Sequence, residues 1–198
     1  MKRLAVAMVA LLAGCAGLTG APWTALIDGE RGLENFYQVG DANWRAEGGA
    51  IVADRGKSGF LLSRYQYRDF ELRAEFWAET DTNSGIFIRC ADVNKIGSVA
   101  CYEVNVWDIR PEPKYGTGAI VDVAAVPVPT VYKAGGRWNT YEITAKGSQL
   151  TVKLNGVETA NVQDTKHASG PFALQMGPGV KGAQGGPIKW RKLEIRPL

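Results

Sequence analysis

The sequence predicts an all-β fold in which two antiparallel sheets pack as a jelly-roll sandwich. Three observations support this fold class. Hydrophobic and polar residues alternate over many short segments, turn-forming residues separate these segments, and no long segment has a helical period. The 198 residues fit one domain, and 24 glycines and nine prolines supply the turns that short strands require. A closed barrel is the alternative that alternation alone leaves open.

The clearest strand covers residues 70–77, where apolar side chains from Phe70 to Phe76 alternate with charged ones. Asn155-Gly156 predicts a tight type I′ hairpin, because this dipeptide favours positive φ at both positions. Further strands are expected at 49–53, 60–62, 84–90, 101–107, 138–145, 149–154, 157–162, 172–176 and 188–195. Burying one face of each sheet requires only this alternation.

The amino terminus predicts export and lipidation. Residues 1–3 are basic at two positions, and the ten apolar residues that follow are too few to span a bilayer but typical of a secretory signal. Leu12-Ala13-Gly14-Cys15 is typical of a lipobox, at which bacteria acylate the cysteine and cleave before it. An ordinary signal peptide with a chance cysteine is the alternative. We expect a signal peptide at 1–14, a lipidated tether at 15–22 and one domain at 23–198.

Acyl chains on Cys15 would attach the protein to a membrane surface without spanning it. Ala16 follows, and the Asp that often retains lipoproteins in the inner membrane is absent. We therefore expect the periplasmic face of the outer membrane, or the cell surface. Removing Lys2 and Arg3 from the 23 basic residues leaves 21 against 20 acidic ones, which argues against a nucleic-acid partner.

Cys90 and Cys101 are expected to form a disulfide across a loop, because export places them in an oxidising compartment. Two separate buried thiols are the alternative. The single histidine, His167, lies in a polar segment expected to be an exposed loop, so a Cys–His nucleophile or zinc site is not expected. No cofactor is predicted, and a divalent metal is kept as an alternative electrophile.

The strands at 84–90 and 101–107 carry the candidate site. Their two-residue period buries isoleucines and valines and sends another set of side chains out through one face. These are Phe87, Arg89, Glu103, Asn105 and Trp107. Aromatic rings pack on the C–H surfaces of sugars, and the polar groups bind hydroxyls, so this face predicts a saccharide groove. The alternative is a solvated surface with an Arg89–Glu103 ion pair.

Two further sets of polar residues have an ordinary structural interpretation. Asp108 ends the same strand and either faces the groove or caps the following turn. Glu71, Arg73 and Glu75 form a second charged face, which we expect to be a solvated surface of alternating sign.

The order and spacing of short motifs resemble the 3-keto-disaccharide hydrolase family from about Trp23 to Leu198. The motifs are W-T-A-L-I-D-G at 23–29, Y-R-D-F-E-L-R-A-E-F at 67–76, T-N-S-G-I-F-I-R at 82–89, Y-E-V-N-V-W-D at 102–108, T-G-A-I at 117–120, G-R-W-N-T-Y-E-I at 136–143, L-N-G at 154–156, G-P-F-A-L-Q at 170–175 and I-K-W-R-K-L-E-I at 188–195. The resemblance implies a concanavalin A-like jelly roll that acts on glycosides oxidised at C3. The family's groove residues would correspond to Arg89, Glu103, Asn105, Asp108 and Gln175.

In such a substrate the C3 ketone acidifies the C2 proton, which allows elimination of the glycosidic oxygen from C1 and then addition of water. Glu103 is the predicted base and Arg89 the predicted stabiliser of the enolate oxygen. Asp108 or Glu142 would supply a second carboxyl group, and direct hydrolysis by a carboxylate pair is the alternative. The residues predicted to bind the sugar are Trp107, Asn105, Phe87 and Gln175.

The chain departs from the family pattern at two places. The family often has Gln where this chain has Asn105, and a His shortly after the Leu-Gln pair, where this chain has Met176-Gly177. If that histidine is needed for chemistry, the protein binds sugar without cleaving it. We therefore expect a hydrolase or lyase of 3-keto-glycosides. The alternatives are a non-catalytic carbohydrate-binding lipoprotein and a structural or adhesion lipoprotein without a sugar site.

Overall fold

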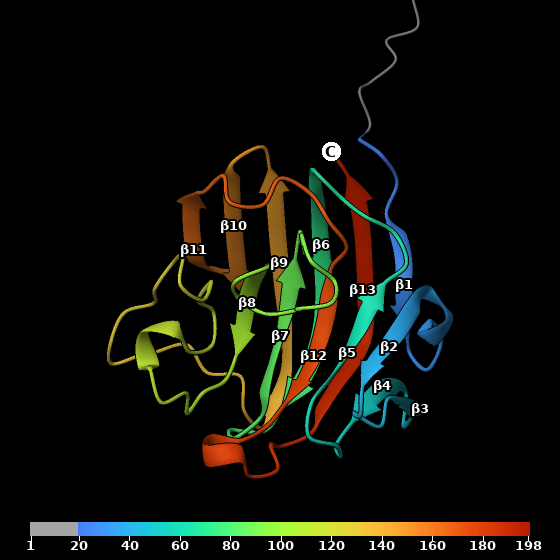
Figure 1. Ribbon diagram of the computed structural model, residues 1–198, viewed down its shortest axis with the longest axis vertical. Helices are drawn as coiled ribbons and strands as arrows, with labels where there is room; N and C mark the ends of the chain where they lie inside the picture. The colour runs from blue at the N-terminus through green and yellow to red at the C-terminus, as the bar shows by residue number, and fades with distance from the viewer. Residues whose placement is uncertain (1–19) are drawn as a thin grey trace, which may run out of the picture.

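The computed structural model describes residues 20–198 and contains two antiparallel sheets packed face to face. Figure 1 looks through both layers, with the five-stranded sheet in front of the eight-stranded sheet. The predicted all-β sandwich is therefore confirmed. The signal peptide at 1–14 and the lipidation site at Cys15 lie outside the described residues. Within residues 20–198, no helix is long and apolar enough to cross a bilayer.

The eight-stranded sheet has the order β11-β10-β9-β6-β13-β4-β3, with β1 beside β13. Its strands are β1 (Thr24–Asp28), β3 (Arg45–Glu47), β4 (Ala50–Ala53), β6 (Phe70–Ala78), β9 (Arg137–Lys146), β10 (Gln149–Leu154), β11 (Val157–Gln163) and β13 (Ile188–Pro197). Asn155 and Gly156 have φ angles of 51° and 80°, as the predicted type I′ turn between β10 and β11 requires.

The five-stranded sheet has the order β2-β5-β12-β7-β8. Its strands are β2 (Phe36–Gly40), β5 (Gly59–Ser63), β12 (Ala173–Gly177), β7 (Asn83–Ile88) and β8 (Tyr102–Val106). Three short 3-10 helices lie in the connections, η1 (Leu33–Asn35), η2 (Pro113–Tyr115) and η3 (Val180–Gly182). The two strands that carry the candidate site, β7 and β8, are therefore neighbours, which brings their outward side chains close together.

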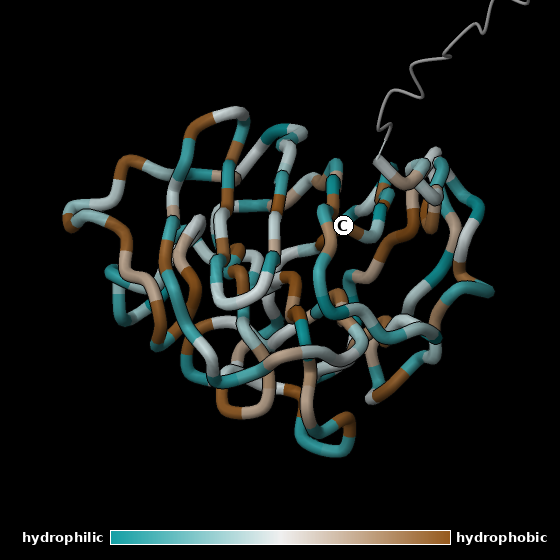
Figure 2. Tube along the Cα trace, turned by 90° about the horizontal axis from the view of Figure 1, so that it is seen from above, coloured by the Kyte–Doolittle hydropathy of each residue, from teal (hydrophilic) through white to brown (hydrophobic). Residues whose placement is uncertain are grey.

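The main core lies between the two sheets and uses the faces that alternation predicts. In β6 the residues from Phe70 to Phe76 alternate between buried and more exposed, and Ile86 and Ile88 of β7 join the same core. In the view from above, hydrophobic and hydrophilic residues alternate along the chain (Figure 2). This packing fixes which side chains of β7 and β8 face outward.

A second, smaller hydrophobic cluster lies on the outer face of the five-stranded sheet. It contains Phe87, Leu62, Ala173 and the disulfide between Cys90 and Cys101. Side chains from the loop at 91–100 pack against it, so the loop covers this part of the outer face. The disulfide closes the loop that covers this part of the face.

Candidate functional site

The outer face of the five-stranded sheet brings the predicted polar residues into two adjacent rows. Strand pairing places Gln175 of β12 opposite Gly85 of β7, and Gly85 opposite Asn105 of β8. In the next row Phe87 lies opposite Glu103. Because neighbouring strands are about 4.8 Å apart, the backbones of Gln175 and Asn105 are separated by about 10 Å. Gly85 has no side chain, so nothing projects from β7 between the two amides.

Glu103 is the one carboxyl group among the predicted outward residues whose charge state is perturbed. Its side chain is buried, and this burial raises its pKa from 4.5 to about 7. The positive charge of Arg110 opposes this rise, and the negative charge of Asp122 reinforces it. A carboxyl group with a pKa near 7 is suited to take up and return a proton at neutral pH.

Two amide oxygens in the adjacent row have no partner among the described residues. They are Oδ1 of Asn105 and Oε1 of Gln175. Asn105 donates through Nδ2 to the carbonyl oxygen of Tyr115 at 2.6 Å, which connects the sheet to η2. A buried acceptor without a donor costs about 1–3 kcal/mol. Such atoms are the expected place for a ligand hydroxyl or a water molecule to donate.

Arg89 does not face this site, and its predicted role is wrong. Strand β7 ends at Ile88, and Arg89 takes a φ of 52°, which breaks the two-residue alternation. Its fully buried guanidinium donates to the carbonyl oxygens of Arg68 (2.8 Å) and Gly147 (2.7 Å) and to Asp69 (3.1 Å). Because Gly147 lies in the turn between β9 and β10, Arg89 connects the two sheets. The alternative of an ion pair with Glu103 is also wrong.

Asp108 holds a loop together and does not present a free carboxylate. It accepts hydrogen bonds from Thr117 Oγ1 (2.6 Å) and from the backbone N–H groups of Ala134 (3.0 Å) and Gly135 (2.9 Å). Lys133 also donates to its carbonyl oxygen. Both carboxylate oxygens are therefore occupied, and the catalytic assignment of Asp108 is replaced by the turn-stabilising one.

Arg110 is the cation that sequence reasoning missed. Its charge lowers the pKa of Glu103, and its guanidinium carbon lies 5.8 Å from the centre of the Trp107 ring. Its Nε is buried and has no partner among the described residues. Arg110 follows β8 in a turn, where alternation gives no direction for a side chain. The signal that could have found it is its place two residues after the Y-E-V-N-V-W-D motif.

The two predicted aromatic residues differ in what they can contact. Phe87 is 1% exposed and packs edge-on against Phe60, with ring centres 5.5 Å apart, so it is part of the second cluster rather than an open platform. Its predicted contact with sugar is therefore wrong. Trp107 is half-buried, and its indole N–H has no partner among the described residues, so it retains a donor for a ligand.

Gly177, in the Met176-Gly177 pair that follows Gln175, has no room for a side chain. It lies opposite Asn83 on the outer face, and a Cβ at this position would come within 2.8 Å of the Asn83 amide nitrogen. That nitrogen donates to the carbonyl oxygen of Pro178 at 2.7 Å. The Asn83 amide therefore occupies the space that a side chain at position 177 would need.

Glu142 and His167 lie elsewhere. Glu142 is on the outer face of the eight-stranded sheet, 3.9 Å from Arg73, so it does not supply a second carboxyl group to Glu103. His167 is buried rather than exposed, with its ring packed edge-on against Tyr102 at 5.1 Å. Within residues 20–198, no group of three His, Cys, Asp or Glu side chains is close enough together to hold a metal ion.

The sequence matches one family profile over nearly all of the described residues. The profile is described as a 3-keto-alpha-glucoside-1,2-lyase-like domain, and it matches residues 22–196. No curated protein matches the chain.

Solved structures show the same fold at low sequence identity. Two are proteins of Parabacteroides distasonis ATCC 8503 provisionally named as glycosyl hydrolases. One is 22% identical with a TM-score of 0.69, covering 89% of this chain and 100% of its own. The other is 14% identical with a TM-score of 0.71, covering 89% and 94%. A carbohydrate-binding module, CBM66 of Bacillus subtilis, is 12% identical with a TM-score of 0.51, covering 89% and 96%. At these identities the likeness establishes the sandwich fold alone.

Proposed function

The chain belongs to the 3-keto-alpha-glucoside-1,2-lyase-like family, and on that premise we propose that it cleaves 3-keto-glycosides at the outer face of the five-stranded sheet. One observation supports this proposal above the others. Glu103 is a buried carboxyl group whose pKa is raised to about 7, and the positive charge of Arg110 acts on it. A base of this strength next to a cation suits the removal of a proton from a carbon beside a ketone.

In the proposed reaction Glu103 takes the C2 proton, and the electron pair of the C2–H bond forms an enolate with its oxygen on C3. Arg110 stabilises the negative charge on that oxygen. The enolate then expels the glycosidic oxygen from C1, and protonated Glu103 returns its proton to this leaving group. Water adds at C1 of the resulting enone and gives the free 3-keto sugar. Glu103 therefore ends each cycle in its starting state.

The neighbouring groups position the sugar. Gln175 is partly exposed, and its unpartnered Oε1 accepts a hydrogen bond from a sugar hydroxyl. Trp107 lies beyond the row of Asn105 and Gln175 along the chain from Glu103, and its unpartnered indole N–H donates to a second hydroxyl. Asn105 is fully buried and hydrogen-bonded to Tyr115, so its role is to hold the segment around η2 against β8.

The test uses 4-nitrophenyl 3-keto-α-glucoside and measures the release of nitrophenol. Glu103→Gln is expected to lower kcat/KM by about 10²–10⁴-fold, the usual contribution of a general base. Glu158→Gln, which changes an exposed carboxylate on β11, is the matched control and should be unaffected. Turnover by Glu103→Gln equal to that of the wild type would remove Glu103 as the base. Reaction in D₂O adds a second measurement, because elimination predicts deuterium at C2 of the product and direct hydrolysis does not.

A carbohydrate-binding protein without catalysis is the second candidate. The observations that favour it are the lack of a histidine in the Met176-Gly177 pair, where the Asn83 amide leaves no room for a side chain at position 177, and the near-complete burial of Glu103. Saturable binding of a 3-keto-glucoside in calorimetry, with no product after prolonged incubation, would establish it in place of the enzyme.

We also propose that Cys15 carries the lipid anchor and that the protein faces the periplasm from the outer membrane, or lies on the cell surface. The L-A-G-C segment supports this assignment. Cys15→Ser is expected to move the protein from the membrane fraction to the soluble fraction and to abolish labelling by radioactive palmitate. Unchanged labelling of the Cys15→Ser protein would contradict it.

A further inference from the structure

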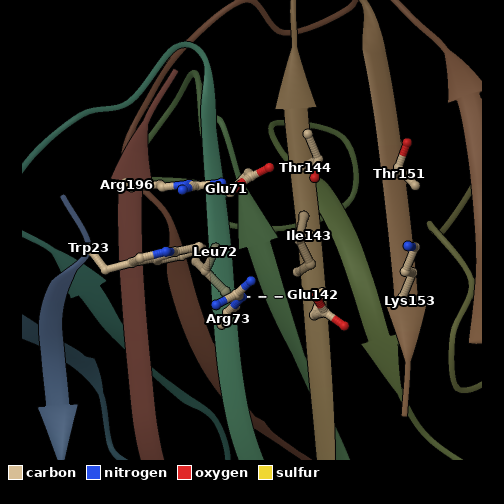
Figure 3. Close-up of a pocket in the computed structure, with 10 residues that line it drawn as sticks. All are labelled: Trp23, Glu71, Leu72, Arg73, Glu142, Ile143, Thr144, Thr151, Lys153 and Arg196. Carbon is tan, nitrogen blue, oxygen red and sulfur yellow. Dashed lines mark hydrogen bonds and ion pairs between the residues drawn. The ribbon is translucent and has the colours of Figure 1, made fainter. Parts of the chain in front are cut away.

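A hollow of about 140 Å³ lies on the outer face of the eight-stranded sheet, on the opposite side of the molecule from Glu103. Figure 3 shows its lining, which comes from β6, β9, β10, β13 and the residue before β1. The side chains that matter for binding are Trp23, Arg73, Thr144, Thr151, Lys153 and Arg196. The catalytic proposal uses none of these groups.

Trp23 is a half-buried aromatic ring whose orientation is held by two arginines. The guanidinium carbon of Arg73 lies 4.3 Å from the ring centre, and that of Arg196 lies 4.8 Å away. Arg196 is itself fixed by hydrogen bonds to Glu71 at 2.5 Å. A ring held in one orientation beside a hollow loses little conformational entropy when a ligand packs against it.

Unused hydrogen-bond donors lie across the hollow from the ring. Thr144 of β9 and Thr151 of β10 are direct cross-strand partners, and Figure 3 shows them side by side. Among residues 20–198, neither threonine hydroxyl has a hydrogen-bond partner and Lys153 forms no ion pair within 4.0 Å. Arg73 is held only loosely, at 3.9 Å from Glu142 and 3.8 Å from Glu194. The two threonines and Lys153 can turn toward a ligand without first breaking a short hydrogen bond, while Arg73 stays against the Trp23 ring.

The chemistry of this lining selects the class of ligand. Sugar hydroxyl groups both donate and accept hydrogen bonds. They can accept from the cations and threonine hydroxyls of the lining and donate to the carboxylates of Glu71 and Glu142. The carboxylates of Glu71 and Glu142 offset two of the three cations of the lining, so the hollow lacks the strongly basic character that recognition of a phosphate or an acidic polymer requires. A peptide strand would need an open sheet edge, whereas this hollow lies on the face of paired strands. We propose that the hollow is a second carbohydrate site, which binds a unit of a neutral glycan.

A second aromatic platform lies on the same face and extends the surface. Trp77 and Trp138 are direct cross-strand partners on β6 and β9, and Trp138 is 36% exposed. Trp77 is four residues beyond Arg73 along β6, which corresponds to about 13 Å at the rise of a strand. A glycan chain that runs along β6 would therefore contact Trp23 at one end and Trp138 at the other. Combined with the proposed function, this surface would keep the domain on a glycan while the opposite face acts on small glycosides.

The test is isothermal calorimetry of the full chain with maltohexaose, cellohexaose, laminarihexaose and xylohexaose, and with polygalacturonate as an acidic comparison. At least one neutral hexasaccharide is expected to bind. Trp23→Ala and Lys153→Ala should each weaken that binding by about tenfold or more. Tyr65→Ala removes another exposed aromatic ring, on the connection after β5, and should leave the affinity unchanged.

Four results would overturn the proposal. These are no binding of any neutral hexasaccharide, equal affinity in the Trp23→Ala and Lys153→Ala proteins, binding of polygalacturonate alone, and loss of binding in Glu103→Gln. The last result would assign the glycan to the opposite face. If Trp23→Ala does not fold, Lys153→Ala and Thr151→Val carry the test, because both change side chains that the main core does not use. Turnover of the nitrophenyl substrate is measured separately, so the two proposals can fail independently.

Discussion

The two outer faces of the sandwich are built from the same strand geometry but differ in how far their polar residues are buried and paired. On the five-stranded sheet, Glu103 and Asn105 are buried, and two amide oxygens have no partner among the described residues. On the eight-stranded sheet, Arg73 and its neighbours are half-exposed and paired across strands with alternating sign. The same sequence pattern, polar residues at every second position, therefore produces both a perturbed site and a solvated surface.

The difference comes from what covers each face. The disulfide-closed loop at 91–100 and the segment that contains η2 pack over the five-stranded sheet, so water is removed from the groups beneath them. The eight-stranded sheet has no such cover over Arg73, where water screens each charge. Removal of water shifts pKa values and makes each polar contact matter more for stability. Variants on the two faces should consequently differ in the size of their effects.

The largest stability effect is expected at Arg89, the buried guanidinium that connects the two sheets. Arg89→Ala leaves the Arg68 and Gly147 carbonyl oxygens without their donor and should lower the free energy of unfolding by about 3–5 kcal/mol. The free energy of unfolding of Arg89→Lys should lie between those of the wild type and Arg89→Ala, because an ammonium group donates hydrogen bonds but cannot reproduce the planar geometry of the guanidinium. Urea denaturation measures both. A stable Arg89→Ala protein that has lost only kcat would restore Arg89 to the catalytic site.

The next effect concerns Glu103 and pH. Its pKa is about 7 in the folded protein and 4.5 when unfolded, so the unfolded chain releases this proton first as the pH rises. The stabilising contribution is complete below pH 4.5 and lost as the pH rises through about 7. Relative to Glu103→Gln, the wild type should lose about 3 kcal/mol between pH 4.5 and pH 8. If the free energies of unfolding of the two proteins change in parallel with pH over this range, the raised pKa of Glu103 is contradicted.

The same titration should appear in catalysis. If Glu103 acts as the base, kcat/KM should rise with pH and level off above about 7, the pKa of this group in the folded protein. Arg110→Gln removes the opposing positive charge and should move this limb to higher pH, because the carboxylate loses a stabilising neighbour. If the pH dependence of kcat/KM is unchanged in Arg110→Gln, the charge of Arg110 does not influence the titration of Glu103.

The smallest effect is expected on the exposed charges of the eight-stranded sheet. Arg73→Ala removes two long ion pairs, one with Glu142 at 3.9 Å and one with Glu194 at 3.8 Å. The side chains of Arg73 and Glu142 are about half exposed, at 49% and 46%. Such pairs contribute about 0–1 kcal/mol, so thermal unfolding should change by no more than a few degrees. A loss comparable to that of Arg89→Ala would show that this face is not the loosely paired surface described above.

The sequence by itself determined the fold class, most strands and the direction of most side chains. In β6, β7 and β8 the alternation of apolar residues permits only one face toward the core, because slipping by one residue would bury every charge. The Asn155-Gly156 turn was equally readable, since few residues tolerate its φ angles. Strands β1, β2 and β3 were not predicted, and β2 and β3 lack a regular alternation of buried residues.

Only the tertiary structure decided which polar residues share a site. Arg89 lies one residue past the end of β7 in a left-handed conformation, where strand parity no longer applies, and its partners come from segments distant in the sequence. Arg110 and Asp108 lie in a turn whose course is set by contacts with residues 115–135. Alternation fixes the side of a sheet on which a residue lies. The loops that cover that side, and hence the burial and the pKa, depend on long-range packing that no local pattern encodes.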